Sequence, residues 1–146
     1  MSFTMDLVNG VAAYLASNPK ASQPLVWRED SVYEGPEFGV YALTAPLKRV
    51  SRTLVIAPFG PESDLTLSDD TVSLQLDARG NKAEVVRVMD DAFDRLQGFW
   101  GGKIGVVAVQ SVARTSVANL GSDEAGNFRQ TQNYDLKVYR PSTHRQ

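Results

Sequence analysis

The chain has 146 residues, of which 42% are hydrophobic and 22% are charged, a composition typical of one globular domain. Its formal net charge of -2 argues against a dedicated nucleic-acid-binding protein, because such proteins depend on clustered lysine and arginine. There is no cysteine, which excludes disulfides, thiolate nucleophiles, iron–sulfur clusters and cysteine-based zinc sites.

No membrane association is expected. No stretch approaches the roughly 20 apolar residues that span a bilayer. The N-terminus lacks a basic region and Asp6 interrupts its apolar run, so no signal peptide is expected either. These features predict a soluble protein, and the lack of cysteine fits a reducing cytosol.

The first half of the chain predicts a helix followed by an irregular arm. Thr4 can cap a helix over 4–17, and Pro19 disfavours its continuation. Residues 18–50 are punctuated by proline and glycine and predict an arm or loop segment, with one short strand at 40–43 as an option. The aromatic residues of this arm either cover an edge of the core or contact a partner.

Two strands are expected next, separated by a loop over 59–69. The first covers 52–58. The second, 71–79, shows the clearest alternation in the sequence, with Val72, Leu74, Leu76 and Ala78 on one face and polar residues on the other. This pattern predicts a sheet with one packed face and one solvated face.

A second helix is predicted over 81–97. Asn81 is a good N-cap, Glu84 lies three residues on as in a capping box, and Gly98 is suited to end the helix. A strand over about 103–118, a hairpin turn over 121–127 and a terminal strand follow. In that last strand Gln132, Tyr134, Leu136 and Val138 share one face, and pairing should stop near Pro141.

The order of elements predicts an α/β (α+β) fold in a single domain, 1–146. We expect a single antiparallel or mixed sheet of four to five strands with two helices on one face. Residues 141–146 are expected to form a flexible tail.

The search for chemistry yields no catalytic, cofactor-binding or metal-binding residue. The one histidine, His144, lies in the polar tail, where nothing would hold a catalytic base in place. The run from Gly98 to Ile104 superficially resembles a phosphate-binding loop, but its glycine spacing is one residue short and Ile104 replaces the required serine or threonine. The acidic loop with Glu62, Asp64, Asp69 and Asp70 matches no calcium-loop spacing, and aspartate there is more simply explained by turn formation.

Two features favour assembly instead. Long terminal strands offer an edge that can pair with another chain. The solvated face of the 71–79 strand mixes hydroxyl, amide and charged side chains: Thr71, Ser73, Gln75, Asp77 and Arg79. Such a face suits the lumen of a ring, and an ordinary exposed sheet face fits these residues equally well. The Asp123-Glu124 turn is a candidate for docking rather than for catalysis.

Several segments occur in a recognisable order. A short N-terminal helix precedes a Pro/Gly-rich segment with Trp27 and Tyr33, and RTLVI (52–56) leads into a Pro/Gly loop. The strand VSLQLDARG (72–80) runs directly into the second helix, and LGxDExG (120–126) is followed by Asn-Tyr (133–134) and Arg-Pro (140–141). In this order the segments resemble the tail terminator proteins of long-tailed bacteriophages, often labelled minor capsid or minor tail proteins.

The resemblance implies a virion structural protein without enzymatic activity or cofactor. Its subunits would assemble, typically as a hexamer, into a ring on the head-proximal end of the tail tube. The ring would stop tube polymerisation and form the interface to the head connector, with DNA passing through its lumen without specific binding. The implied partners are further copies of the chain, the major tail tube protein and the head-tail connector protein. The implied location is the virion, and the host cytoplasm during assembly.

Two alternatives remain open at this stage. The first is a neck or head-completion protein on the other side of the same joint. The second is a small α/β enzyme or ligand-binding module that uses the acidic loop at 62–70.

Overall fold

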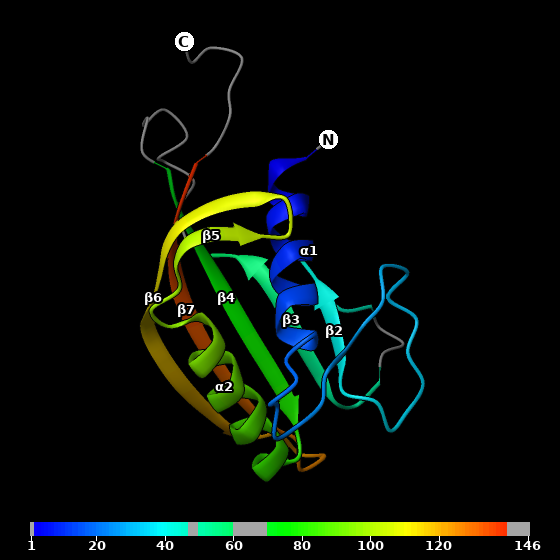
Figure 1. The fold of residues 1–146 in the computed structure, drawn as a ribbon. Helices are drawn as coiled ribbons and strands as arrows, with labels where there is room; N and C mark the ends of the chain where they lie inside the picture. The colour runs from blue at the N-terminus through cyan, green and yellow to red at the C-terminus, as the bar shows by residue number, and fades with distance from the viewer. Residues whose placement is uncertain (1, 47–49, 60–69, 140–146) are drawn as a thin grey trace.

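The computed structural model describes residues 2–46, 50–59 and 70–139. Its seven-stranded mixed sheet curls into a half-barrel around two helices (Figure 1). The elements, in chain order, are α1 (Phe3–Ala16), β1 (Val26–Trp27), β2 (Gly39–Ala42), β3 (Thr53–Pro58), β4 (Asp70–Gly80), α2 (Lys82–Leu96), β5 (Trp100–Ile104), β6 (Val107–Ser122) and β7 (Phe128–Val138).

The strand order across the sheet is β1-β2-β3-β4-β7-β6-β5. The pairs β1–β2 and β2–β3 are parallel, and all other neighbours are antiparallel. The long central strands β4 and β7 pair over their whole length, from Asp70↔Val138 to Gly80↔Phe128. Each of them therefore presents one set of alternate residues to the helices and the other set to the convex side.

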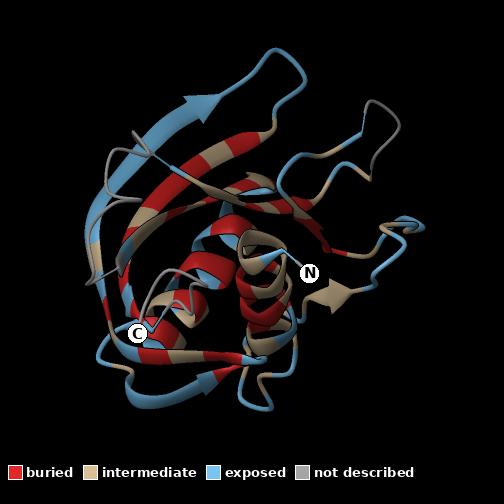
Figure 2. Ribbon diagram, turned by 90° about the horizontal axis from the view of Figure 1, so that it is seen from above, coloured by how far each residue is buried: buried red, intermediate tan, exposed pale blue. Residues whose placement is uncertain are grey.

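Both helices lie inside the curl of the sheet (Figure 2). Asn81 caps α2, because its side chain accepts hydrogen bonds from the backbone N–H groups of Ala83 and Glu84. The N-terminus of α1 is capped by Ser2, two residues earlier than the predicted Thr4. Apolar residues of both helices and of the concave sheet face form the core, among them Leu7, Leu74, Leu76, Met89 and Leu136. No described helix is long and apolar enough to cross a membrane.

One close approach fixes α1 against the sheet. Gly10, in the middle of α1, faces the turn between β5 and β6. A Cβ atom built on Gly10 would lie 2.9 Å from the Ile104 carbonyl oxygen and 3.3 Å from Gly105 Cα. Only a residue without a side chain permits this contact, because the opposing atoms belong to the backbone.

A row of hydrogen-bonded polar side chains runs along the concave face of β7 beside α2; three of them are buried, and it ends at the exposed Asn119 of β6. The Tyr134 hydroxyl donates to Gln132 Oε1 at 2.6 Å, Gln132 Nε2 donates to Gln130 Oε1 at 3.0 Å, and Gln130 Nε2 donates to Asn119 Oδ1 at 2.8 Å. We call Asn119, Gln130, Gln132 and Tyr134 the amide chain. Burial raises the pKa of the Tyr134 hydroxyl above its ordinary value. Each buried side chain of this amide chain thus has a hydrogen-bond partner, as a protein interior requires.

The expectation of four to five strands is wrong, because the sheet has seven. Three strands account for the difference from four. Two of them, β1 and β2, lie in the segment expected to be irregular, where β2 overlaps the optional strand at 40–43. There β1 pairs in parallel with β2, and β2 in parallel with β3, so neither strand is joined to its partner by a hairpin. The third comes from the glycine-rich link after α2, where a turn at Gly105, with φ of 61°, folds β5 back onto β6.

The alternation predicted for the two central strands is confirmed. Leu74, Leu76 and Ala78 of β4 are buried, while Gln75 and Asp77 are partly exposed on the other face. In β7 the side chains of Gln132, Tyr134, Leu136 and Val138 are buried. The hairpin between β6 and β7 is also observed, and Asp123 and Glu124 lie at its turn.

Candidate functional site

The convex face of β4 and β7 carries the predicted polar residues, and no helix covers it (Figure 2). We call this surface the convex polar face, formed by Thr71, Ser73, Gln75, Asp77 and Arg79 of β4 and by Arg129, Asn133, Asp135 and Lys137 of β7. The register places them opposite one another across the two strands. The structure therefore brings together all five of the predicted β4 residues.

Hydrogen bonds across the strands link these side chains in pairs. The Ser73 hydroxyl donates to Asp135 Oδ1 at 2.6 Å, and Gln75 Nε2 donates to Asn133 Oδ1 at 3.2 Å. Asn133 in turn donates to the Ser116 hydroxyl of β6 at 2.7 Å. Cross-strand pairs of this kind stabilise a sheet and leave few donors and acceptors free for a ligand.

The strongest pair on the face is ionic. Arg129 donates to both carboxylate oxygens of Asp77, from Nε at 2.9 Å and from Nη2 at 2.7 Å. The hydrogen bond to Asp77 raises the pKa of the Arg129 guanidinium. Arg79 lies opposite Arg129 in the register and has no hydrogen-bond or ion-pair partner among the described residues. Its guanidinium is therefore the charge in this part of the face that is available to a partner.

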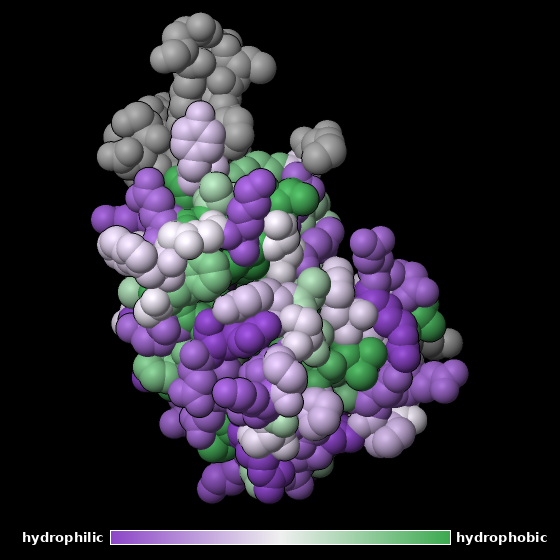
Figure 3. Space-filling view, viewed as in Figure 1, coloured by the Kyte–Doolittle hydropathy of each residue, from purple (hydrophilic) through white to green (hydrophobic). Residues whose placement is uncertain are grey.

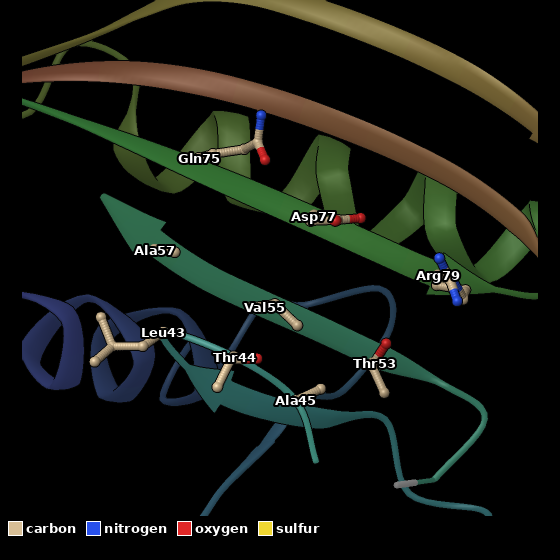
Figure 4. Close-up of a pocket in the computed structure, with 9 residues that line it drawn as sticks. All are labelled: Leu43, Thr44, Ala45, Thr53, Val55, Ala57, Gln75, Asp77 and Arg79. Atoms are coloured by element: carbon tan, nitrogen blue, oxygen red, sulfur yellow. The ribbon is translucent and has the colours of Figure 1, made fainter. Parts of the chain in front are cut away.

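A shallow pocket lies on the convex side, where β3 and β4 meet the segment after β2 (Figure 4). Its volume is about 320 Å³. Nine residues line it: Leu43, Thr44, Ala45, Thr53, Val55, Ala57, Gln75, Asp77 and Arg79. The lining combines apolar side chains with hydroxyl groups, one amide, one paired carboxylate and the Arg79 guanidinium, and it contains no nucleophile–base pair of the kind that covalent catalysis uses.

The turn between β6 and β7 is held by Asp123. Its carboxylate accepts hydrogen bonds from the backbone N–H groups of Ala125 and Asn127, each at 2.9 Å. The bond from Asn127 is the main cause of the lowered pKa of Asp123. Asp123 thus acts as a turn residue, and Glu124 is the exposed acidic side chain beside it.

The acidic loop lies largely outside the described residues. Glu62, Asp64 and Asp69 fall there, and of Asp70 only the backbone is described, as the start of β4. His144 also falls outside. Among residues 2–46, 50–59 and 70–139, no group of three or more histidine or acidic side chains could hold a metal ion.

Two polar residues were not predicted: Arg129, within the convex polar face, and Ser116 of β6, which accepts a hydrogen bond from Asn133 beside it. The alternation of the last strand was followed from Gln132, and Arg129 lies before that residue. The same alternation, extended back from Asn133, places Arg129 on the convex polar face. Ser116 follows a β-bulge between Arg114 and Ser116, which breaks the simple alternation of β6. A bulge of this kind leaves no clear signal in the sequence.

Figure 3 shows the side of the molecule on which the helices lie. Hydrophilic residues predominate over it in the space-filling view, and the hydrophobic residues appear in small separate areas (Figure 3). That face offers no broad apolar surface for docking.

Comparison with known proteins gives a likeness of fold. No protein-family model matches the sequence, and no curated protein matches it. Among solved structures, the chain is similar to a chain of the virion of a native gene transfer agent particle, with a TM-score of 0.50 and 13% identity over 69% of this chain and 78% of that one. A structure from Akkermansia muciniphila, determined without its transmembrane region, has a TM-score of 0.35 and 10% identity over 62% of this chain and 47% of that one, too low to indicate a shared fold.

Proposed function

We propose that the chain is a virion structural protein of the phage tail terminator type. In this role it forms a ring, most simply a hexamer, on the head-proximal end of the tail tube. It halts polymerisation of the major tail tube protein and presents a surface to the head connector. The proposal gives the protein a role in assembly rather than in catalysis.

The observation that carries the proposal is the shared fold with a chain of a gene transfer agent virion. The ordered segments described above, which resemble tail terminators along most of the chain, support the finer assignment. Likeness of fold alone does not specify function, so the finer assignment depends on the experiments below.

The convex polar face fits the lumen of such a ring. Its side chains bond to one another across β4 and β7, and its charges are of both signs, with Asp77 and Asp135 beside Arg79, Arg129 and Lys137. A face of this kind is hydrated and does not concentrate the positive charge that binds phosphates tightly. DNA would therefore pass it without specific binding. We assign Glu124 to contacts with a neighbouring ring or tube, with Asp123 holding the turn that presents it.

The test is deletion of the gene, followed by electron microscopy of the tails. We expect tails of irregular length that do not join heads, and rescue by the gene supplied in trans. Tails of normal, uniform length in the deletion strain would refute the proposal. Native mass spectrometry of the protein bound to isolated tail tubes should show a closed ring.

The neck or head-completion alternative makes a different prediction for the same particles. A tail terminator is present on purified tails that lack heads, whereas a head-completion protein is present on tailless heads. Immunolabelling of both fractions therefore distinguishes the two proteins.

A further inference from the structure

Among the residues that the structure describes, none pairs with the outer edge of the distal half of β6. β5 pairs with β6 only as far as Ser111, and the N–H of Arg114 bonds to the side chain of Gln97 at 2.8 Å. Beyond that point, residues 115–122 pair with β7 on one side and with no described residue on the other. In Figure 1 this part of β6 runs along the outer margin of the sheet.

This edge has few of the features that keep sheet edges from pairing. All side chains from Thr115 to Ser122 are exposed, including those of Val117 (44%) and Leu120 (51%). The segment contains no charged residue and no proline, the two commonest protections of an edge. Its bulges, between Arg114 and Ser116 and between Asn119 and Gly121, leave a regular stretch of four residues, Ser116 to Asn119.

The opposite edge of the same sheet is the two-residue strand β1. The N–H of Val26 bonds to the Phe38 carbonyl oxygen at 3.0 Å. Because backbone groups alternate along a strand, the N–H and C=O groups of Trp27 point away from β2. The β1 edge is two residues long, so it is short enough to pair with the regular stretch of β6 between its two bulges.

The two edges lie at the same level of the sheet. The registers connect Val26, Gly39, Thr53, Arg79, Arg129 and Gly121 in one row across six strands. The next row joins Trp27 to Asn119 in the same way. The strand directions also agree, since β1 and β6 run in opposite senses and would form an antiparallel pair.

We propose that the distal edge of β6 binds the β1 edge of a second copy of this chain, so that the sheet continues from one subunit to the next. The contact is head to tail, because it joins two different surfaces. Since both edges lie in the same rows, each copy is added without displacement along the strands, which favours a closed ring over a helical filament. The inference rests on the proposed ring-forming function and names the surface that forms the ring.

The natural chain has no cysteine, so two introduced cysteines can report this contact without background. We would place them at Val26→Cys on β1 and Ala118→Cys on β6, and treat the folded protein with a short bismaleimide over a range of concentrations. The double variant should give a ladder of covalent dimers, trimers and larger species on a denaturing gel. Each single variant should remain monomeric, because a head-to-tail contact does not bring two copies of one position together.

Three results would overturn the inference. One is a double variant that stays monomeric up to its solubility limit. Another is dimer formation by Ala118→Cys alone, which would mean that two β6 edges pair with each other. The third result comes from adding Val117→Lys to the double variant. This substitution should reduce the amount of cross-linked species in the ladder at least tenfold. An undiminished ladder there would refute pairing at this edge.

The matched control for that substitution is Val106→Lys, at the exposed turn between β5 and β6 and therefore away from the proposed contact. It should leave the ladder intact. Far-UV circular dichroism of every variant checks that the fold is retained. These results are independent of the tail-length phenotype, so the contact can fail while the proposed function stands.

Discussion

Replacing Gly10 with alanine is the sharpest test of how α1 sits against the sheet. In an isolated helix this change stabilises by about 1 kcal/mol, because glycine is a poor helix former. Here the new Cβ would meet the Ile104 carbonyl oxygen at 2.9 Å, the Ile104 carbonyl carbon at 3.2 Å and Gly105 Cα at 3.3 Å. All three atoms belong to the backbone, so no side chain can rotate away to make room.

Overpacking of this kind costs about 1–3 kcal/mol, and the rigid surroundings place the cost in the upper half of that range. After subtraction of the gain in helix propensity, we expect Gly10→Ala to lower the free energy of unfolding by about 1–2 kcal/mol. For a chain of 146 residues, this corresponds to a fall in Tm of roughly 3–6 °C.

Urea and thermal unfolding, followed by circular dichroism, measure both quantities. Ala13→Gly, at an exposed position of the same helix, is the control and should cost about 1 kcal/mol through propensity alone. If Gly10→Ala instead raised stability by about 1 kcal/mol, the close packing of α1 on the β5–β6 turn would be refuted.

Three further variants test other parts of the structure. Asn81→Ala should lower the free energy of unfolding by about 1 kcal/mol in urea titrations, because two backbone N–H groups of α2 lose their acceptor. Tyr134→Phe should cost about 1–3 kcal/mol at neutral pH, since Gln132 Oε1 is left buried without a donor. Because the pKa of Tyr134 is raised, the natural protein loses stability as pH rises above about 10. The difference in free energy of unfolding between the natural protein and Tyr134→Phe should therefore narrow above that pH. A constant difference would contradict a buried, protonated Tyr134 hydroxyl. Asp77→Asn should cost at most about 1 kcal/mol, because the pair with Arg129 is partly exposed, and the difference should shrink with added salt.

The two central strands could be predicted because their alternation is local and regular. β4 changes between apolar and polar residues at every step, and only one face of it contacts the helices. The N-cap of α2 was equally predictable, since the Asn81 side chain needs only the next three residues to form its bonds. Glu84 departs from that prediction, because its carboxylate pairs with Arg52 of a distant segment.

The missing strands were not predictable from local patterns. β1 pairs in parallel with β2, and β2 with β3, and a parallel partner leaves no hairpin signal in the sequence. β2 was therefore predicted only as an option at 40–43, and β1 was not predicted. β5 is exposed over four of its five residues, so it lacks the apolar pattern that marks a strand. The convex polar face was foreseen on β4, and its hydrogen bonds depend on the β4–β7 register, which only the folded sheet defines.

The amide chain has a consequence for how reliably the hairpin of β6 and β7 forms. Gln130 is a buried amide of β7 that finds its partner on β6 only when Asn119 stands in the observed alignment, whereas the bonds of Gln132 to Gln130 and Tyr134 lie within β7. A slip of β6 along β7 would remove the bond to Asn119 and leave the buried Gln130 amide without its acceptor, at about 1–3 kcal/mol. An error in alignment is therefore rejected by the interior of the subunit, so the outer margin of β6 keeps a fixed position whether or not a neighbour is present.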